Sequence, residues 1–253
     1  MRTLPFLYLA TILETTQLIP NNLHLLRPHS GIAGHHLEGI NCLSWRLAVE
    51  TDNIQDWDVV PSECENYIGN YMLGQQYRDD CQFVADAAYD YAKNLTLAGD
   101  GLDIWVFDID ETTLSNLPYY AENGFGAEEY NSTSFNAWVE EGIAPALPAS
   151  LDFYKKLIDL GFKVVFLTGR HETYEEITIS NLKNQGYTTW EKLILKPGND
   201  SSTAVVYKST ERAALEAKGY RILGNMGDQW SDLLGTPTGN RTFKVPDPMY
   251  YIG

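Results

Sequence analysis

The sequence predicts an α/β protein with a doubly wound, Rossmann-like parallel sheet. Short apolar runs of strand length alternate with stretches of helical pattern in the second half of the chain. Continuous apolar runs are typical of strands buried on both faces, and their alternation with helices favours a parallel sheet. Ligands in such folds bind at the carboxyl ends of the strands, so the polar residues that follow each strand indicate the function.

Four strands and three helices are expected after residue 101, and a mainly helical region precedes them. The strands are predicted at Ile104–Phe107, Lys163–Leu167, Leu193–Leu195 and Ile222–Leu223. The helices are predicted from about Ala149, where apolar residues line one face, from Glu172 to Asn184, and from Thr210 to Lys218. The region from Glu63 to Lys93 has helical pattern and is expected to pack against the sheet domain.

The chain is expected to divide into three parts. Residues 1–41 form an N-terminal arm or a signal segment, since Arg2 precedes an apolar run but no clear cleavage site follows it. Residues 42–101 form a helical extension. Residues 102–253 form the core, with a small cap inserted at about 113–148. Four histidines of the arm, at positions 24, 29, 35 and 36, are irregularly spaced, which favours a surface loop over a metal site.

Charge and hydropathy exclude two classes of function. The 253 residues carry a formal net charge of −16, which repels the phosphates of nucleic acids. No apolar stretch reaches the roughly 18 residues that a membrane-spanning helix requires. We therefore expect neither a nucleic-acid partner nor a membrane partner, and most of the charge is expected to serve solubility.

Residues that suit phosphoryl transfer follow the predicted strands. Such a reaction needs an in-line nucleophile, positive charge for the phosphate oxygens and a proton donor for the leaving group. Carboxylates can share a hard cation such as Mg²⁺, and a lysine, a hydroxyl and main-chain N–H groups can bind phosphate oxygens. The candidate residues are Asp108, Asp110, Thr168, Gly169, Lys208, Asp228 and Asp232.

Each of these short motifs also has an ordinary structural interpretation. An Asp-x-Asp after a strand is often a turn or a helix cap, and Thr168-Gly169 has the composition of an ordinary turn. Lys208 also suits a solvated helix start. The combination, in this order and at successive strand ends, favours a catalytic site over four unrelated turns.

The motifs resemble those of the haloacid-dehalogenase superfamily. Within it, the chain is similar to the plant class B acid phosphatases and vegetative storage proteins. The stretches that carry this likeness are Ser44–Glu50, Asp108-Ile-Asp-Glu-Thr112, Phe166-Leu-Thr-Gly-Arg170, Lys208, Gly227-Asp-Gln-Trp-Ser-Asp-Leu-Leu234 and Pro246-Asp-Pro-Met-Tyr-Tyr251. The likeness extends from about Cys42 to the end of the chain.

The resemblance implies a role for each candidate residue. Asp108 corresponds to the nucleophile that becomes an aspartyl-phosphate, and Asp110 to the general acid and base. Thr168, Gly169 and Lys208 correspond to phosphate-binding groups. The implied magnesium ligands are Asp108, Asp110 (through its main-chain carbonyl), Asp228 and Asp232.

The implied function is that of an acid phosphatase that hydrolyses small phosphomonoesters with Mg²⁺. The alternative is a vegetative storage protein with little or no catalysis, because some relatives of this kind lack the first aspartate, whereas this chain keeps Asp108. The short cap is expected to leave an open site. A homodimer and a vacuolar or extracellular location are further expectations.

The resemblance to secreted relatives also bears on the three cysteines. The cysteine count alone allows one disulfide with a spare thiol or three buried reduced thiols. The resemblance implies a disulfide between Cys42 and Cys64 and a free thiol at Cys81. Four Asn-x-Ser/Thr sequons are candidate glycosylation sites if the chain enters the secretory pathway; they begin at Asn94, Asn131, Asn199 and Asn240.

Overall fold

The computed structural model describes residues 40–253, which belong to one compact unit. Residues 1–39, which hold most of the predicted arm or signal segment and its four histidines, lie outside the described residues. None of the helices in the described part is long and apolar enough to cross a membrane.

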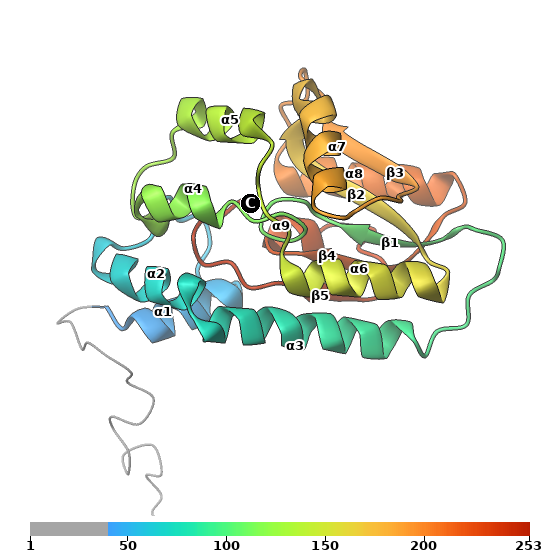
Figure 1. Ribbon diagram of the computed structural model, residues 1–253, viewed down its shortest axis with the longest axis horizontal. Helices are drawn as coiled ribbons and strands as arrows, with labels where there is room; N and C mark the ends of the chain where they lie inside the picture. Colours follow the sequence, from blue (N-terminus) through green and yellow to red (C-terminus); the bar gives the residue numbers. More distant parts are fainter. Residues whose placement is uncertain (1–39) are drawn as a thin grey trace, which may run out of the picture. The chain divides into compact units, whose positions relative to one another are not determined.

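The centre of the fold is a five-stranded sheet in which all neighbouring strands are parallel. Its strands are β1 (Asp103–Phe107), β2 (Lys163–His171), β3 (Lys192–Lys196), β4 (Arg221–Gly227) and β5 (Thr242–Lys244). Their order across the sheet is β3-β2-β1-β4-β5 (Figure 1). This order reverses between β1 and β4, as in other doubly wound sheets, so the predicted fold class is confirmed.

Helices cover both faces of the sheet. Trp105 and Phe107 of β1 point to the face that is covered by α3 (Gln75–Ala92) and α6 (Pro148–Leu160). Ile104 and Val106 point to the opposite face, where Tyr207 and Leu215 of α8 (Ala204–Ala217) complete a second apolar cluster. Because both faces are covered, every residue of β1 is buried. This burial explains the unbroken apolar run from Ile104 to Phe107.

The structure corrects several predicted boundaries and adds one strand. Strand β2 continues to His171 rather than ending at Leu167, so Thr168 and Gly169 lie within it, and β4 spans Arg221–Gly227 rather than Ile222–Leu223. Strand β5 was not predicted, because a three-residue strand at a sheet edge gives almost no hydrophobic pattern. Helix α8 begins at Ala204 rather than near Thr210, because the Thr203 side chain caps it by accepting a hydrogen bond from the Val206 N–H. Lys208 therefore lies inside α8 rather than ahead of it. Helix α6 (Pro148–Leu160) matches the helix predicted from about Ala149, and the η4 turn (Glu172–Tyr174) with α7 (Glu175–Asn184) matches the one predicted from Glu172 to Asn184.

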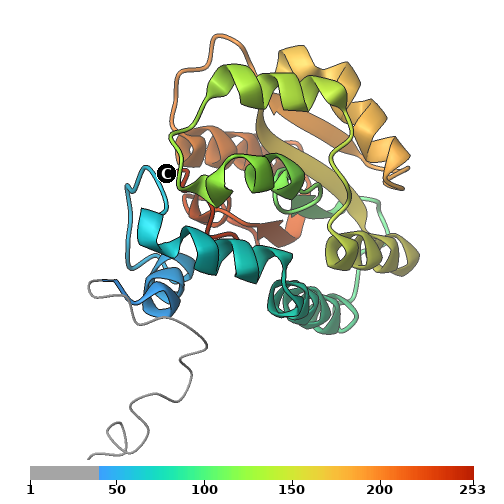
Figure 2. The same ribbon diagram turned by 60° about the vertical axis from the view of Figure 1, so that its left-hand side comes forward.

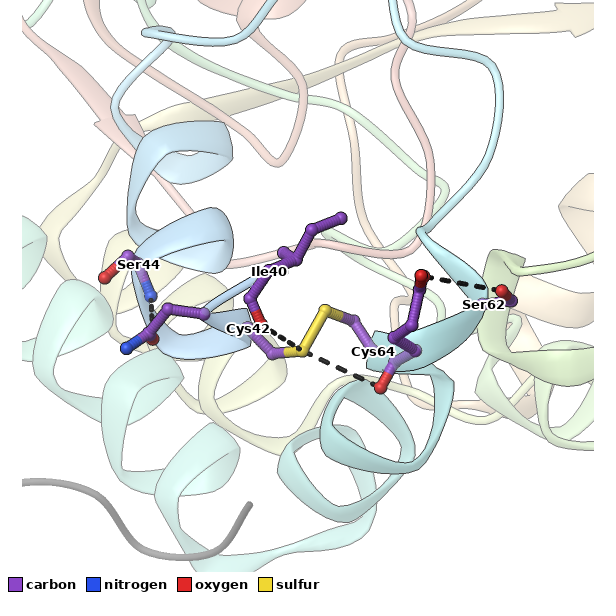
Figure 3. The surroundings of a disulfide bond; sticks show 7 residues. Ile40, Cys42, Ser44, Ser62 and Cys64 are labelled. Carbon is purple, nitrogen blue, oxygen red and sulfur yellow. Dashed lines mark hydrogen bonds between the residues drawn. A yellow bond between two sulfur atoms is a disulfide. The ribbon is translucent and has the colours of Figure 1, made fainter. Parts of the chain in front are cut away.

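The N-terminal helices are tied together by a disulfide. Cys42 begins α1 (Cys42–Glu50), and Cys64 ends the 3₁₀ turn η2 (Ser62–Cys64), which leads into α2 (Glu65–Leu73). The two cysteines are joined, with Cα atoms 5.4 Å apart (Figure 3). Cys81 of α3 is a buried free thiol. The predicted pairing is therefore confirmed.

The segment between β1 and α6 contains two helices and a 3₁₀ turn: α4 (Leu117–Glu122), η3 (Gly124–Gly126) and α5 (Ser132–Glu141). We call residues 117–141, which hold these three elements, the cap. Asn131 caps α5 by accepting hydrogen bonds from the N–H groups of Thr133 and Ser134. In both ribbon views α4 lies between α5 and α2 (Figures 1 and 2). Tyr119, Tyr120 and Phe135 pack on one another, so part of the cap's aromatic content forms its own small core.

Candidate active site

The candidate site lies where the strand order reverses, at the carboxyl ends of β1 and β4. Asp108 is the first residue after β1, and its N–H donates to the carbonyl of Met226 in β4. Asp228 is the first residue after β4. Since β1 and β4 are neighbours and parallel, the two aspartates leave the sheet side by side.

A lysine from the opposite layer reaches this point. Lys208 lies in the second turn of α8, and its ammonium donates to Asp108 Oδ1 at 2.7 Å and to the Asp232 carboxylate. All three side chains are at most 7% exposed. Burial by itself would lower the pKa of Lys208, but the two carboxylates outweigh it and raise the pKa above its ordinary value. The lysine is therefore a fixed positive charge beside Asp108.

Three carboxylates form a cluster that suits a divalent cation. Oxygen atoms of Asp108, Asp228 and Asp232 all lie within 4.8 Å of one another, and all three residues are buried. Burial, followed by the charge of Asp232, raises the pKa of Asp108 well above its usual range and that of Asp228 to about 8. One lysine does not balance three buried carboxylates. The cluster thus has both the oxygen ligands and the excess negative charge that a hard cation requires.

Asp110 has a different environment from that cluster. Arg170 donates from Nε and Nη2 to its carboxylate, with a shortest distance of 2.7 Å, and Asn116 Nδ2 donates at 2.7 Å. Burial raises the pKa of Asp110, but the charge and hydrogen bonds of Arg170 outweigh burial, and the pKa lies below its ordinary value. The dominant neighbour is therefore an arginine, and the carboxylate of Asp110 is not part of the three-aspartate cluster.

The other predicted residues line the same pocket. Thr168 is fully buried in β2, and its hydroxyl accepts a hydrogen bond from the Arg170 N–H. Gly169 is exposed, and no atom lies within 4 Å of the position that a Cβ would occupy there, so its main chain is accessible from the pocket. A ligand oxygen can approach this backbone closely.

The pocket above these residues has a volume of about 940 Å³. Its floor holds the charged groups Asp108, Asp110, Arg170 and Lys208. Its walls come from the cap, from the turn after β2, from the start of α8 and from the last residues of the chain. They are rich in aromatic residues: Tyr119, Tyr120, Tyr130, Phe135, Tyr174, Tyr207, Tyr250 and Tyr251. The cap thus leaves an open cleft that is large enough for a small organic phosphate.

Sequence reasoning missed several residues that hold the site together. Arg170 and Thr112 lie within the stretches that carry the family likeness, but the likeness implies no role for either residue. The Thr112 hydroxyl donates to Asp228 Oδ1 at 2.9 Å. Gln229 donates to Asp228 Oδ2 at 2.8 Å. Thr112 and Gln229 lie close in sequence to the candidate acids Asp110 and Asp228, and this proximity is the one sequence feature that could have indicated their roles. Proximity in sequence does not give the direction of a side chain, however.

Comparisons with known proteins show the family to which the chain belongs. The family model for subfamily IIIB of the HAD superfamily, acid phosphatase, matches residues 30–253. Acid phosphatase 1 of Solanum lycopersicum is 44% identical, and the alignment covers all of both chains. The stem 28 kDa glycoprotein of Glycine max is 48% identical over the whole chain and 99% of the relative. Vegetative storage protein 1 of Arabidopsis thaliana is 42% identical over 96% of this chain and 89% of the relative.

A solved structure supports the fold independently. The class C acid phosphatase from Bacillus anthracis superposes with a TM-score of 0.63 and 21% identity, covering 75% of this chain and 86% of the other. The superposition shows that the two proteins share a doubly wound α/β fold. The chain belongs to the acid phosphatase family, subfamily IIIB of the HAD superfamily. The predicted superfamily and enzyme class are therefore confirmed.

Proposed function

We propose that this protein is an acid phosphatase that hydrolyses small phosphomonoesters through an aspartyl-phosphate on Asp108, with Mg²⁺ as its metal. The observation that carries the proposal is the position of Asp108. Its carboxylate lies at the floor of an open pocket, 2.7 Å from the Lys208 ammonium and beside the carboxyl groups of Asp228 and Asp232. The candidate nucleophile, a fixed positive charge and a carboxylate cluster suited to a metal ion thus lie next to one another.

The first step transfers the phosphoryl group to the protein. An Asp108 oxygen attacks phosphorus, the bond between phosphorus and the leaving oxygen breaks, and Asp110 donates a proton to that oxygen. In the second step water attacks the same phosphorus, Asp110 takes a proton from the water, and the Asp108 carboxylate is released with inorganic phosphate. Lys208, the Thr168 hydroxyl and the main chain at Gly169 would bind the phosphate oxygens; all three residues line the pocket, which supports this role.

Arg170 has a supporting part in this scheme. Its guanidinium fixes the Asp110 carboxylate in one orientation through hydrogen bonds from two nitrogens. It also favours the ionised form of Asp110, which is the form that accepts a proton from water, so the protonated form that the first step needs is populated mainly at acidic pH. The geometry therefore suits the hydrolysis of the phospho-enzyme as it stands.

The carboxylates of Asp108, Asp228 and Asp232 would hold Mg²⁺, together with the main-chain carbonyl of Asp110. The ion would neutralise negative charge on the transferring phosphoryl group. The chain's own residues orient the cluster, since Lys208 holds Asp108 and Asp232 while Thr112 holds Asp228. Mg²⁺ fits the all-oxygen character of this set.

The second candidate function is storage with little catalysis. It is favoured by the similarity to the vegetative storage proteins of Arabidopsis thaliana. The presence of Asp108, Lys208 and Asp228 in a connected site favours the enzyme. Steady-state hydrolysis of p-nitrophenyl phosphate, with Mg²⁺ and after chelation, separates the two. A rate that is at the level of the uncatalysed reaction under both conditions would support storage.

Replacing the nucleophile is the direct test of the mechanism. We expect Asp108→Asn to reduce turnover of p-nitrophenyl phosphate at least a hundredfold, roughly the loss expected when a nucleophile is removed, because an amide is a poor nucleophile and a poor magnesium ligand. The change is nearly isosteric, so the circular dichroism spectrum should match that of the wild type. A folded variant that keeps more than about a hundredth of the rate would contradict the assignment.

We also propose a vacuolar or extracellular location. The Cys42–Cys64 disulfide supports it, because such bonds persist in oxidising compartments. The homodimer and the glycosylation of the four sequons stay predictions.

A further inference from the structure

The last residues of the chain return to the active site. After β5, residues 245–252, which we call the C-terminal segment, run along the pocket, and Met249, Tyr250, Tyr251 and Ile252 contribute to its wall. In both ribbon views the C-terminus lies beside the cap (Figures 1 and 2). This segment contains the motif Pro246-Asp-Pro-Met-Tyr-Tyr251, to which the reaction scheme assigns no part.

Gln229 connects this segment to the carboxylate cluster. Its Nε2 donates to Asp228 Oδ2 at 2.8 Å and to Asp247 Oδ2 at 3.0 Å, while its Oε1 accepts from the Ile252 N–H at 3.0 Å. Both amide protons and the amide oxygen are thus used. Gln229 is only 6% exposed, and Asp228 and Asp247 are each 1% exposed, so water does not substitute readily for these bonds.

The amide can take only one of its two orientations here. If it were turned by 180°, its oxygen would face two carboxyl groups and its N–H groups would face the Ile252 N–H. The Ile252 N–H, together with the two carboxyl groups and the Asp232 N–H that also donates to this side chain, therefore selects the orientation in which Gln229 donates to Asp228. With Thr112 donating to the other oxygen of Asp228, the plane of that carboxylate is determined from both sides.

The segment is itself held firmly against the core and the cap. The Met249 N–H donates to Asp247 Oδ1 at 3.0 Å, and the Tyr250 hydroxyl donates to Glu111 Oε2 at 3.1 Å. The Tyr250 ring stacks on Tyr120 of α4, with centroids 5.4 Å apart. Gly126 contacts the Met249 carbonyl so closely that a Cβ there would lie 1.8 Å from its oxygen. These contacts give the Ile252 N–H a defined position.

We propose that Gln229 and the main chain of Ile252 are positioning residues for the metal site: the C-terminal segment orients the Gln229 amide, which orients the Asp228 carboxylate toward the cation. The inference rests on the proposed magnesium function of Asp228. Groups that orient a ligand typically change metal affinity about 10- to 100-fold when they are removed.

Two C-terminal truncations form a matched pair for the test. A chain that ends at Ile252 keeps the N–H that donates to Gln229 Oε1, whereas a chain that ends at Tyr251 lacks it. We also use Gln229→Met, which keeps the length of the side chain but removes its polar atoms. Its control is Gln185→Met, which removes a hydrogen bond from the Ala146 N–H to a glutamine outside the carboxylate cluster.

The primary measurement is the Mg²⁺ dissociation constant of the metal-free full-length protein and its variants, by isothermal titration calorimetry. We expect it to rise at least tenfold for Gln229→Met and severalfold for the chain ending at Tyr251. It should stay within twofold of wild type for Gln185→Met and for the chain ending at Ile252. The second measurement is p-nitrophenyl phosphate hydrolysis against Mg²⁺ concentration, where kcat at saturating Mg²⁺ should fall less than the affinity does. Melting temperatures identify any variant that is merely unfolded.

The outcomes separate the two proposals. If the wild type binds Mg²⁺ and turns over substrate, but the chain ending at Tyr251 and a folded Gln229→Met bind Mg²⁺ as the wild type does, the positioning role is wrong and the phosphatase function stands. Equal weakening in both truncations would also overturn it, because Gly253 is not part of the network. If the wild type neither binds Mg²⁺ nor hydrolyses the ester, the proposed function itself fails.

Discussion

Asp108 and Asp110 are two residues apart, yet their surroundings give them opposite electrostatic character. Asp108 faces other carboxylates and Lys208, and its pKa is raised chiefly by burial. Asp110 faces Arg170 and Asn116, and its pKa is lowered in spite of burial. Two carboxylates with different partners are suited to different roles in one reaction.

The role of Asp110 can be tested by comparing leaving groups. Protonation matters most for a poor leaving group, so Asp110→Asn should slow an alkyl phosphate by about a hundredfold or more, and p-nitrophenyl phosphate less in the first step. Loss of the base should then let the phospho-enzyme accumulate. Rapid-quench measurement with the aryl ester should show a burst of nitrophenol followed by a slow phase. Equal losses for both esters and no burst would reduce Asp110 to a structural partner of Arg170.

The reactivity of the Cys81 thiol provides a second prediction about a single residue. Burial raises the pKa of its thiol to about 12, so almost no thiolate exists at neutral pH. We expect no alkylation of the native protein by iodoacetamide at pH 7.5. Unfolding without reductant should expose one reactive thiol, read by intact mass, because the other two cysteines are paired. Alkylation of the native protein at the rate of a free cysteine would contradict this.

Among the elements, the neighbouring strands β1 and β4 carry most of the site, and an ion pair joins their first residues. Arg221 at the start of β4 donates from Nε to Asp103 Oδ1 at 2.6 Å, and the Ala98 N–H donates to Asp103 Oδ2 at 2.7 Å. The hydrogen bond from Arg221 is the largest influence, and it lowers the pKa of Asp103 despite burial. Asp103 and Arg221 are also register partners in the sheet.

This ion pair predicts a pH-dependent contribution to stability. Because the pKa of Asp103 is lower in the folded chain, its contribution is fully present above its unfolded value of about 3.9 and is lost as the pH falls toward the folded value. Asp103→Asn should lower the free energy of unfolding at pH 7 by up to about 1 kcal/mol. The difference from wild type, measured by urea denaturation, should shrink below about pH 4.

A control is available on the same arginine. Asp100 also accepts from Arg221, but its side chain is 47% exposed, so Asp100→Asn should have the smaller effect. If the difference between Asp103→Asn and wild type were independent of pH down to pH 3, the ion pair would not be the source of the stability.

For the whole molecule, the doubly wound topology brings distant parts of the sequence to one edge of the sheet. Asp108 and Lys208 are 100 residues apart, and Thr112 and Asp228 are 116 apart, yet each pair is hydrogen-bonded. The N-terminal helices are anchored to this core as well. The ammonium of Lys244, the last residue of β5, lies 2.6 Å from a carboxylate oxygen of Glu50 in α1. The site therefore depends on the folding of nearly the entire described chain.

The disulfide stabilises the whole molecule, because it restricts the conformations of the unfolded chain. Cys42 and Cys64 are separated by 22 residues, and closing a loop of this length stabilises the folded state by about 3 kcal/mol in the chain-entropy model. The double variant Cys42→Ser and Cys64→Ser should lose about this much free energy of unfolding in urea. The variant Cys81→Ala retains the bridge and serves as the control. A loss below about 1 kcal/mol for the double variant would contradict the entropic account.

Much of the fold could be predicted because the strands are buried on both faces. The run Ile104–Phe107 has no polar residue and could be placed to within one residue, since burial demands an unbroken apolar pattern. The edge strand β5 and the start of α8 depend on pairing and capping rather than on an apolar run, and both were missed or misplaced.

The candidate catalytic residues could also be identified from the sequence, because their types and order match the needs of phosphoryl transfer. The fold class, most of the strands that lead to the site and the residue types present there follow from local sequence pattern. The hydrogen-bond partner of each group follows from the folded chain: Arg170 for Asp110, Lys208 for Asp108 and Asp232, and Gln229 for Asp228. The physical reason is that apolar periodicity is a local property, whereas the direction of a polar side chain is set by neighbours far away in the chain.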